Sequence, residues 1–183
     1  MKLLNLLAPI GLMLSASVFA GGSLDLSIND QTAGLEYDAT RMGSPMHVSA
    51  GILHHEEDGN LISAGLNAVD VREPNSSLRI GIGGKVYGYF TDPGDGGALG
   101  IGGFARYAPP ELNGVGFGGH AYYAPSVLSF SGTENMVDVA LRVEYMLLPT
   151  AMVYLGYRYV EANEEDLEIE VANNGHFGLK INF

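Results

Sequence analysis

The chain has 183 residues, 21 Asp and Glu against nine Lys and Arg, a formal net charge of −12, and no cysteine. The missing cysteine excludes disulfides, a cysteine-linked lipid anchor, thiol catalysis and thiolate metal sites, and the acidic balance argues against nucleic acid as a partner. Twenty-six glycines beside ten tyrosines and seven phenylalanines favour twisted, closed sheets with aromatic girdles.

The N-terminal residues predict a signal peptide. Lys2 gives a positive start, Leu3–Val18 is mostly apolar, and small residues lead to a cleavage site after Ala20. An N-terminal transmembrane anchor is the alternative, and it is disfavoured because Pro9 interrupts the apolar stretch and no positive residues follow it. We therefore expect residues 1–20 to be removed and residues 21–183 to form a single domain.

Segments of alternating apolar and polar residues then follow one another to the end of the chain, which predicts β-strands. The expected bounds are 24–29, 33–40, 46–55, 61–69, 78–90, 98–107, 114–123, 136–147, 151–160 and a closing strand that ends at Phe183. Ten is an even number, as bacterial barrels require. The predicted fold is therefore all-β, a small antiparallel up-and-down transmembrane β-barrel, with eight strands as the alternative if the first two segments lie outside it or form one bent strand.

The last eight residues carry the clearest pattern. Side chains alternate across a strand, so an apolar face opposes a polar face made of His176, Gly178, Lys180 and Asn182. The apolar face, which we expect to be read by the outer-membrane insertion machinery, consists of Phe177, Leu179, Ile181 and Phe183. A soluble lipocalin-like barrel would turn its apolar face inward, and the signal peptide together with the terminal phenylalanine favours the membrane barrel.

The longer connections are expected on the outer side of the membrane, because both termini should lie on the periplasmic side. These connections contain no Lys or Arg, and their twelve acidic residues are Glu56, Glu57, Asp58, Asp92, Asp95, Glu134, Glu161, Glu164, Glu165, Asp166, Glu168 and Glu170. Alternation of Leu167, Ile169 and Val171 with glutamates predicts that the last hairpin continues beyond the membrane.

The acidic outer face would lie beside the phosphates of lipopolysaccharide. Weak Mg²⁺ or Ca²⁺ contacts are expected there, with a merely solvated face as the alternative. The residues of these contacts are Glu56, Glu57, Asp58, Glu164, Glu165 and Asp166. We expect no dedicated metal site and no cofactor.

Period-two alternation places the remaining charges on the lumenal face. This predicted network consists of Asp25, Glu36, Asp38, Arg79, Lys85, Arg106, Asp138, Arg142, Glu144, Arg158 and Lys180. Because isolated buried charges are costly, nearly balanced opposite charges predict a paired filling. Barrels of this size are filled by side chains, so a plugged lumen is expected, and a narrow charge-lined solute pore is the alternative.

A lipid-modifying enzyme is a further alternative, and no enzyme is the expectation. His120 and His176 could meet Ser126, Ser129 or Ser131 at the outer rim to form a serine, base and acid arrangement. No serine lies in a recognisable nucleophile elbow, and a lone lumenal histidine is more often a hydrogen-bonded filler.

Several segments resemble a known family. They are Leu24-Asp25-Leu26-Ser27-Ile28, His54-His55-Glu56-Glu57-Asp58-Gly59, Gly81-Ile82-Gly83-Gly84-Lys85-Val86-Tyr87, Tyr122-Tyr123-Ala124-Pro125 and Gly156-Tyr157-Arg158-Tyr159. With the alanine-ended signal, they are similar to the YfaZ family of Gram-negative outer-membrane proteins over essentially the whole mature chain. The resemblance implies an outer-membrane location and a barrel fold. Together with the plugged lumen, this leads us to expect a structural or surface-interaction role. The resemblance implies no catalytic residue.

Overall fold

The computed structural model describes residues 21–40, 45–56, 59–70, 77–91, 94–164 and 167–183, so the predicted signal peptide lies outside the described residues. The strands are β1 (Gly22–Ile28), β2 (Thr32–Thr40), β3 (Met46–His55), β4 (Gly59–Val69), β5 (Leu78–Phe90), β6 (Asp95–Tyr107), β7 (Val115–Ala124), β8 (Ser129–Phe130), β9 (Thr133–Leu148), β10 (Ala151–Glu164) and β11 (Leu167–Asn182). Two short 3-10 turns, η1 (Pro110–Leu112) and η2 (Ser126–Leu128), lie in the connections.

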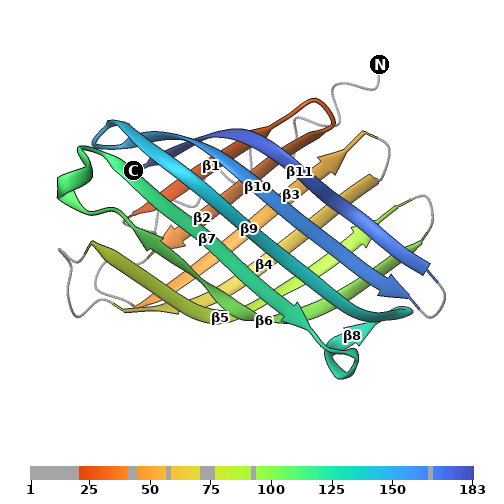
Figure 1. The fold of residues 1–183 in the computed structure, drawn as a ribbon. Helices are drawn as coiled ribbons and strands as arrows, with labels where there is room; N and C mark the ends of the chain where they lie inside the picture. The colour runs from red at the N-terminus through yellow and green to blue at the C-terminus, as the bar shows by residue number, and fades with distance from the viewer. Residues whose placement is uncertain (1–20, 41–44, 57–58, 71–76, 92–93, 165–166) are drawn as a thin grey trace, which may run out of the picture.

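Ten of these strands close into an antiparallel barrel (Figure 1). Each pairs with its neighbour in the chain, except that the two-residue β8 is passed over and β7 pairs directly with β9. The ring closes between the first and last strands, where Leu24 lies opposite Ile181. The prediction of ten strands is confirmed and the eight-strand alternative is wrong, because β1 and β2 are separate members of the ring.

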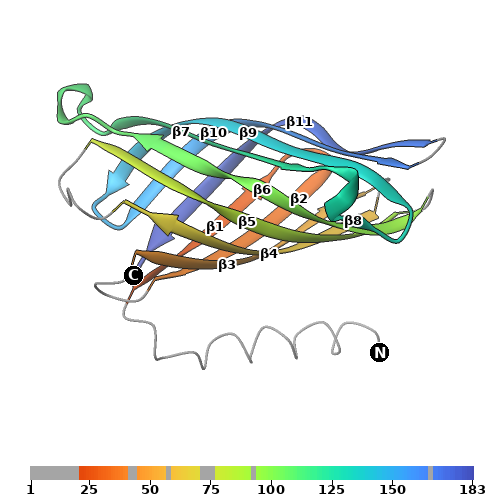
Figure 2. The same ribbon diagram turned by 90° about the horizontal axis from the view of Figure 1, so that it is seen from below.

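The two ends of the barrel differ (Figure 2). At the first end, here called the Phe183 end, the N–H of Gly22 donates to the carbonyl of Phe183 at 2.8 Å and the N–H of Phe183 donates back at 2.9 Å. At the other end, the distal end, lie β8 and the hairpin of β10 and β11 (Figure 1). The C-terminal phenylalanine therefore completes the ladder between the closing strand and β1.

The outer surface of the barrel is apolar. Leu141 and Leu155 are 69% and 68% exposed, and Ile82, Ile101 and Phe177 also point outward. An apolar band of this extent is the surface that lipid covers in membrane barrels. The apolar face is thus the outer one, as predicted, and not the lumenal one of a lipocalin-like barrel.

Among the described residues, no helix is long and apolar enough to cross a membrane.

Several strands extend farther toward the distal end than predicted. β6 begins at Asp95 and β9 begins at Thr133. β10 continues to Glu164 and β11 begins at Leu167, which confirms that the last hairpin continues as strand. The register of β10 against β11 shifts between Val160 and Glu161. A bulge of this kind changes which face successive residues occupy, and it determines how the distal lumen is filled.

Candidate functional site

The distal part of the lumen is an apolar core. It contains Leu53, Leu61, Tyr87, Tyr89, Ala98, Tyr122, Ala124, Met136, Val160, Ala162, Ile169, Val171 and Ala172, all of them buried. Consecutive residues Val171 and Ala172 are both buried because the bulge leaves Val171 without a partner on β10. The bulge turns Ile169 and Val171 inward, although the alternation that places Phe177 outward would point them outward as well.

Tyr89 anchors this core to the polar rim. Its ring is fully buried, and its hydroxyl lies 2.7 Å from Thr133 Oγ1 and donates to Glu164 Oε1 at 2.9 Å. Glu164, one of the predicted cation contacts, is here the acceptor for a lumenal tyrosine on β5. An unsatisfied buried hydroxyl is costly, so the glutamate stabilises the closed rim.

The other predicted cation contacts give no cluster in the described residues. Glu56 is exposed, and Glu57, Asp58, Glu165 and Asp166 lie outside the described residues. Within the described ranges no group of three His, Cys, Asp or Glu side chains is arranged to hold a metal ion.

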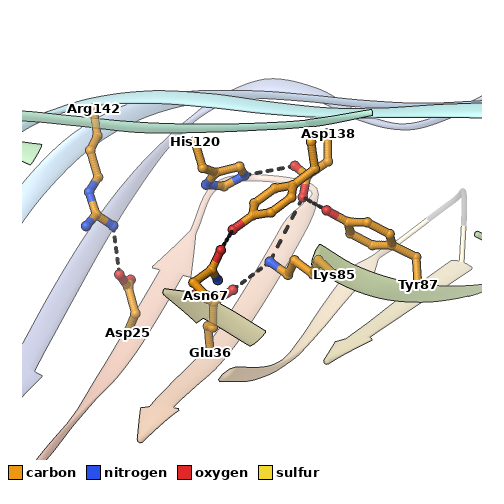
Figure 3. A network of polar contacts seen from close by, with 9 residues as sticks. Asp25, Glu36, Asn67, Lys85, Tyr87, His120, Asp138 and Arg142 are labelled. Atoms are coloured by element: carbon orange, nitrogen blue, oxygen red, sulfur yellow. Dashed lines mark hydrogen bonds and ion pairs between the residues drawn. The ribbon is translucent and has the colours of Figure 1, made fainter. Parts of the chain in front are cut away.

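Below the apolar core, Lys85 bridges two walls of the barrel (Figure 3). Its ammonium group, on β5, lies 2.8 Å from Glu36 Oε2 on β2 and 4.0 Å from Asp138 Oδ2 on β9. Lys85 and Asp138 are buried. Because a buried charge requires a partner of opposite sign, this contact ties together strands that are not neighbours in the sheet.

Asp138 gathers further side chains from β5 and β7 (Figure 3). The Tyr87 hydroxyl donates to its Oδ2 at 2.8 Å, and His120 Nε2 lies 2.9 Å from its Oδ1. Nearby, the Tyr122 hydroxyl donates to Asn67 Oδ1 at 2.9 Å. The tyrosines were not among the predicted network residues, although Tyr87 and Tyr89 share the alternation phase of Lys85, which is the signal that could have identified them.

A second charged layer lies nearer the Phe183 end. Arg142 Nη1 on β9 pairs with Asp25 Oδ2 on β1 at 2.8 Å, and its Nε lies 2.7 Å from Glu144 Oε1. Arg106 Nε on β6 pairs with Glu144 Oε2 at 2.5 Å, and the Tyr154 hydroxyl donates to Asp25. Glu144 is almost completely buried and is held by two guanidinium groups.

The remaining members of the predicted network differ from these. Asp38 lies 2.9 Å from His47 Nδ1. Arg79, Arg158 and Lys180 line the lumen, but none of the three has an ion-pair partner among the described residues. Every lumenal carboxylate of the predicted network is therefore paired, whereas half of its six cations are not.

The layers surround a chamber of about 570 Å³. Its walls include Gly22, Thr40, Pro149 and Asn182 at the Phe183 end. Toward the distal end the chamber reaches Leu53, Leu61 and Val160, which belong to the apolar core. The lumen is thus filled at the distal end and hollow toward the Phe183 end, which differs from a plug along its whole length.

The proposed serine and histidine arrangement does not assemble. His120 is bound to Asp138 in the middle layer, and His176 is buried in the lumen with its ring 5.8 Å from that of Tyr154 in an edge-on contact. Ser126 and Ser129 lie in and after η2 at the distal end, where Ser129 Oγ donates to the carbonyl of Pro125.

The family described as YfaZ precursor matches residues 1–183, the whole chain. The comparison with curated proteins finds no match.

The chain is similar to the outer membrane channel DcaP of Acinetobacter baumannii, with 10% sequence identity and a TM-score of 0.45 over 87% of this chain. It is also similar to a structure described as "Unveiling the Mechanism Behind the in-meso Crystallization of Membrane Proteins", with 10% identity and a TM-score of 0.45 over 89% of this chain and 82% of the other. The chain spans 54% of the DcaP chain.

Proposed function

Because this chain belongs to the YfaZ family, we propose that it is a sealed β-barrel of the Gram-negative outer membrane with a structural or surface-interaction role and no enzymatic activity. The outward apolar band supports the membrane location, with lipid and lipopolysaccharide as its surroundings. We further propose that residues 1–20 are removed as a signal peptide, so that the mature chain begins at Gly21.

The observation that carries the sealed lumen is the core at the distal end. Tyr89, Met136 and Val171 are at most 1% exposed, and they come from β5, β9 and β11, which lie on different sides of the ring. Packed apolar side chains leave no room for water, and an ion would lose its hydration in crossing them. The lumen below them is hollow, but a solute entering at the Phe183 end would stop at this core.

The chamber is also the observation that favours the second candidate, a narrow solute pore. Rearrangement of the β10–β11 hairpin would be needed to connect the chamber to the distal side. The two candidates differ in whether the resting protein conducts.

Planar-bilayer recording of the refolded protein tests this proposal. We expect no discrete conductance steps from the wild type, and steps from a Tyr89→Ala, Met136→Ala double variant that shortens the core. Val143→Ala is the matched control, since Val143 faces outward and its truncation leaves the lumen unchanged. Reproducible steps from the wild type would instead establish the pore.

A further inference from the structure

All the basic residues of the described chain line the lumenal chamber or its mouth. The described residues contain six Lys and Arg, and each of them lines the lumenal chamber: Arg79, Lys85, Arg106, Arg142, Arg158 and Lys180. In a chain of net charge −12, this concentrates positive charge in one enclosed place. Lys85, Arg106 and Arg142 form ion pairs with lumenal carboxylates. Arg79, Arg158 and Lys180 have no ion-pair partner in the described part of the chain.

Arg158 is the unpaired cation with the most structured surroundings. It lies on β10, half-buried, and its guanidinium reaches across β11 to the strands beyond. A Cβ atom on Gly34 of β2 would lie 3.4 Å from Arg158 Nη1 and 2.4 Å from Ser27 Oγ of β1. The Ser27 hydroxyl therefore occupies the space that a side chain at Gly34 would fill, and the Arg158 guanidinium lies beside it on the wall of the chamber.

His176 adds a second polar group with poor hydrogen bonding to this place. It lies opposite Gly156 in the β10–β11 register, one step along the lumenal face from Arg158. The residue is 8% exposed, it lines the chamber, and its ring makes only a distorted hydrogen bond, to the backbone of Asn174. A buried polar atom with a poor hydrogen bond is costly, and so is a half-buried guanidinium that, like Arg158 in the described part of the chain, forms no ion pair.

We propose that the chamber binds an oxyanion, a phosphate or carboxylate group, with Arg158 as its principal ligand and Ser27 and His176 as further hydrogen-bond donors. An anion at this position satisfies the three groups together, and the guanidinium fork suits the geometry of phosphate and carboxylate oxygens. The ligand enters from the Phe183 end, because the chamber reaches that end and stops at the apolar core. This inference does not depend on whether the lumen conducts.

Isothermal titration calorimetry of the full mature barrel in neutral detergent tests the site. Phosphate and acetate serve as separate probes at constant ionic strength set with chloride, and dihexanoyl phosphatidic acid as a third probe separates a lipid headgroup from a free anion. We expect saturable binding of at least one free oxyanion to the wild type. Arg158→Gln should weaken it about tenfold or more, since a charge-assisted hydrogen bond is lost.

Matched variants distinguish a specific anion site from non-specific attraction by the positive charges of the lumen. Arg79→Gln removes the same charge from an exposed position at the chamber mouth and should change affinity less than about threefold, because exposed charges are screened. Arg158→Lys keeps the charge but loses the fork, so its affinity should lie between those of wild type and Arg158→Gln. His176→Asn should also weaken oxyanion binding. If Arg158→Gln fails to form a heat-modifiable barrel, the affinity of His176→Asn is compared with that of the wild type instead.

Two results would overturn the proposal. The first is the absence of saturable binding of either free oxyanion to the wild type. The second is equal weakening in Arg79→Gln and in the folded Arg158 or His176 variants, which would leave only a diffuse electrostatic attraction.

Discussion

The ring of the C-terminal Phe183 stacks on Tyr37 of β2, with the ring centroids 6.2 Å apart and an interplanar angle of 24°. The same residue exchanges two backbone hydrogen bonds with Gly22. The last side chain therefore reaches past β1 to the second strand, across the line where the barrel closes. A terminal aromatic residue in this position contributes to closure as well as to any recognition during assembly.

Deletion of Phe183 should lower the amount of protein in the outer membrane. The deletion removes the stack on Tyr37 and the two hydrogen bonds to Gly22, and it removes the terminal aromatic that we expect the insertion machinery to engage. Heat-modifiable barrel in outer-membrane fractions measures the effect, and Phe183→Tyr, which keeps an aromatic ring, should behave like the wild type. Equal barrel levels in the deletion and wild-type strains would contradict the prediction.

Substitution of Leu141 by arginine should destabilise the barrel by about 2–4 kcal/mol, as charged side chains do on the lipid face near the midplane. Leu141 is 69% exposed on the outer face of β9, between lumenal neighbours. Reversible unfolding from lipid bilayers gives the free energy of unfolding, and Leu141→Ala separates the loss of bulk from the added charge. An unchanged free energy in Leu141→Arg would mean that the register of β9 is wrong by one residue.

Substitution of Lys85 by methionine should cost about 3 kcal/mol, because it removes the only ion pair of Glu36 in the described chain and the lysine contact of the buried Asp138, which keeps its contacts with Tyr87 and His120. Lys180→Met, which breaks no ion pair among the described residues, is the matched control and should cost clearly less. Unfolding midpoints in urea at constant lipid composition provide the comparison. Equal costs in the two variants would show that the Lys85 bridge adds nothing to stability.

Substitution of Arg142 by glutamine should cost less than Lys85→Met. Glu144 keeps its contact with Arg106 at 2.5 Å, and Asp25 keeps the hydrogen bond from Tyr154, so neither carboxylate is left alone. The same urea series measures this difference. A double variant with Arg106→Gln should cost more than the sum of the two single changes, since Glu144 then has no guanidinium partner; strict additivity would argue against a shared role.

Alanine at Gly102 should destabilise the barrel by about 1–3 kcal/mol, the range for overpacked sites. A Cβ there would lie 1.9 Å from the carbonyl oxygen of Ala121 on the next strand, so the backbones of β6 and β7 would have to separate. Gly84→Ala is the control, because its Cβ would meet the carbonyl oxygen of Gly100 at 3.4 Å and Leu99 Cδ1 at 3.6 Å, which are ordinary van der Waals distances. Similar unfolding free energies for the two variants would contradict the close approach of these strands.

Local patterns determined the class of fold and the face that meets lipid. Side chains alternate with period two along every strand, so the sequence alone indicates which residues of β9 and β10 share a face, and the outward positions of Leu141 and Leu155 were predictable. The count of ten strands followed from the same alternation and from the turn residues that separate the alternating segments. These features depend only on residues that lie near one another in the chain.

Tertiary structure decided which lumenal charges meet and where the lumen ends. Lys85 and Glu36 are separated by 49 residues in the chain, and Arg142 and Asp25 by 117. Their contacts depend on how the barrel closes and how its strands are staggered, and alternation along a strand specifies neither. The distal core depends on a bulge in β11, opposite Val160 and Glu161 of β10. The bulge turns the side chains of Ile169 and Val171 from the outer face to the lumen. Alternation could assign a charge to the lumen, but only the closed barrel brings the Arg158 guanidinium of β10 beside Ser27 of β1 and Gly34 of β2.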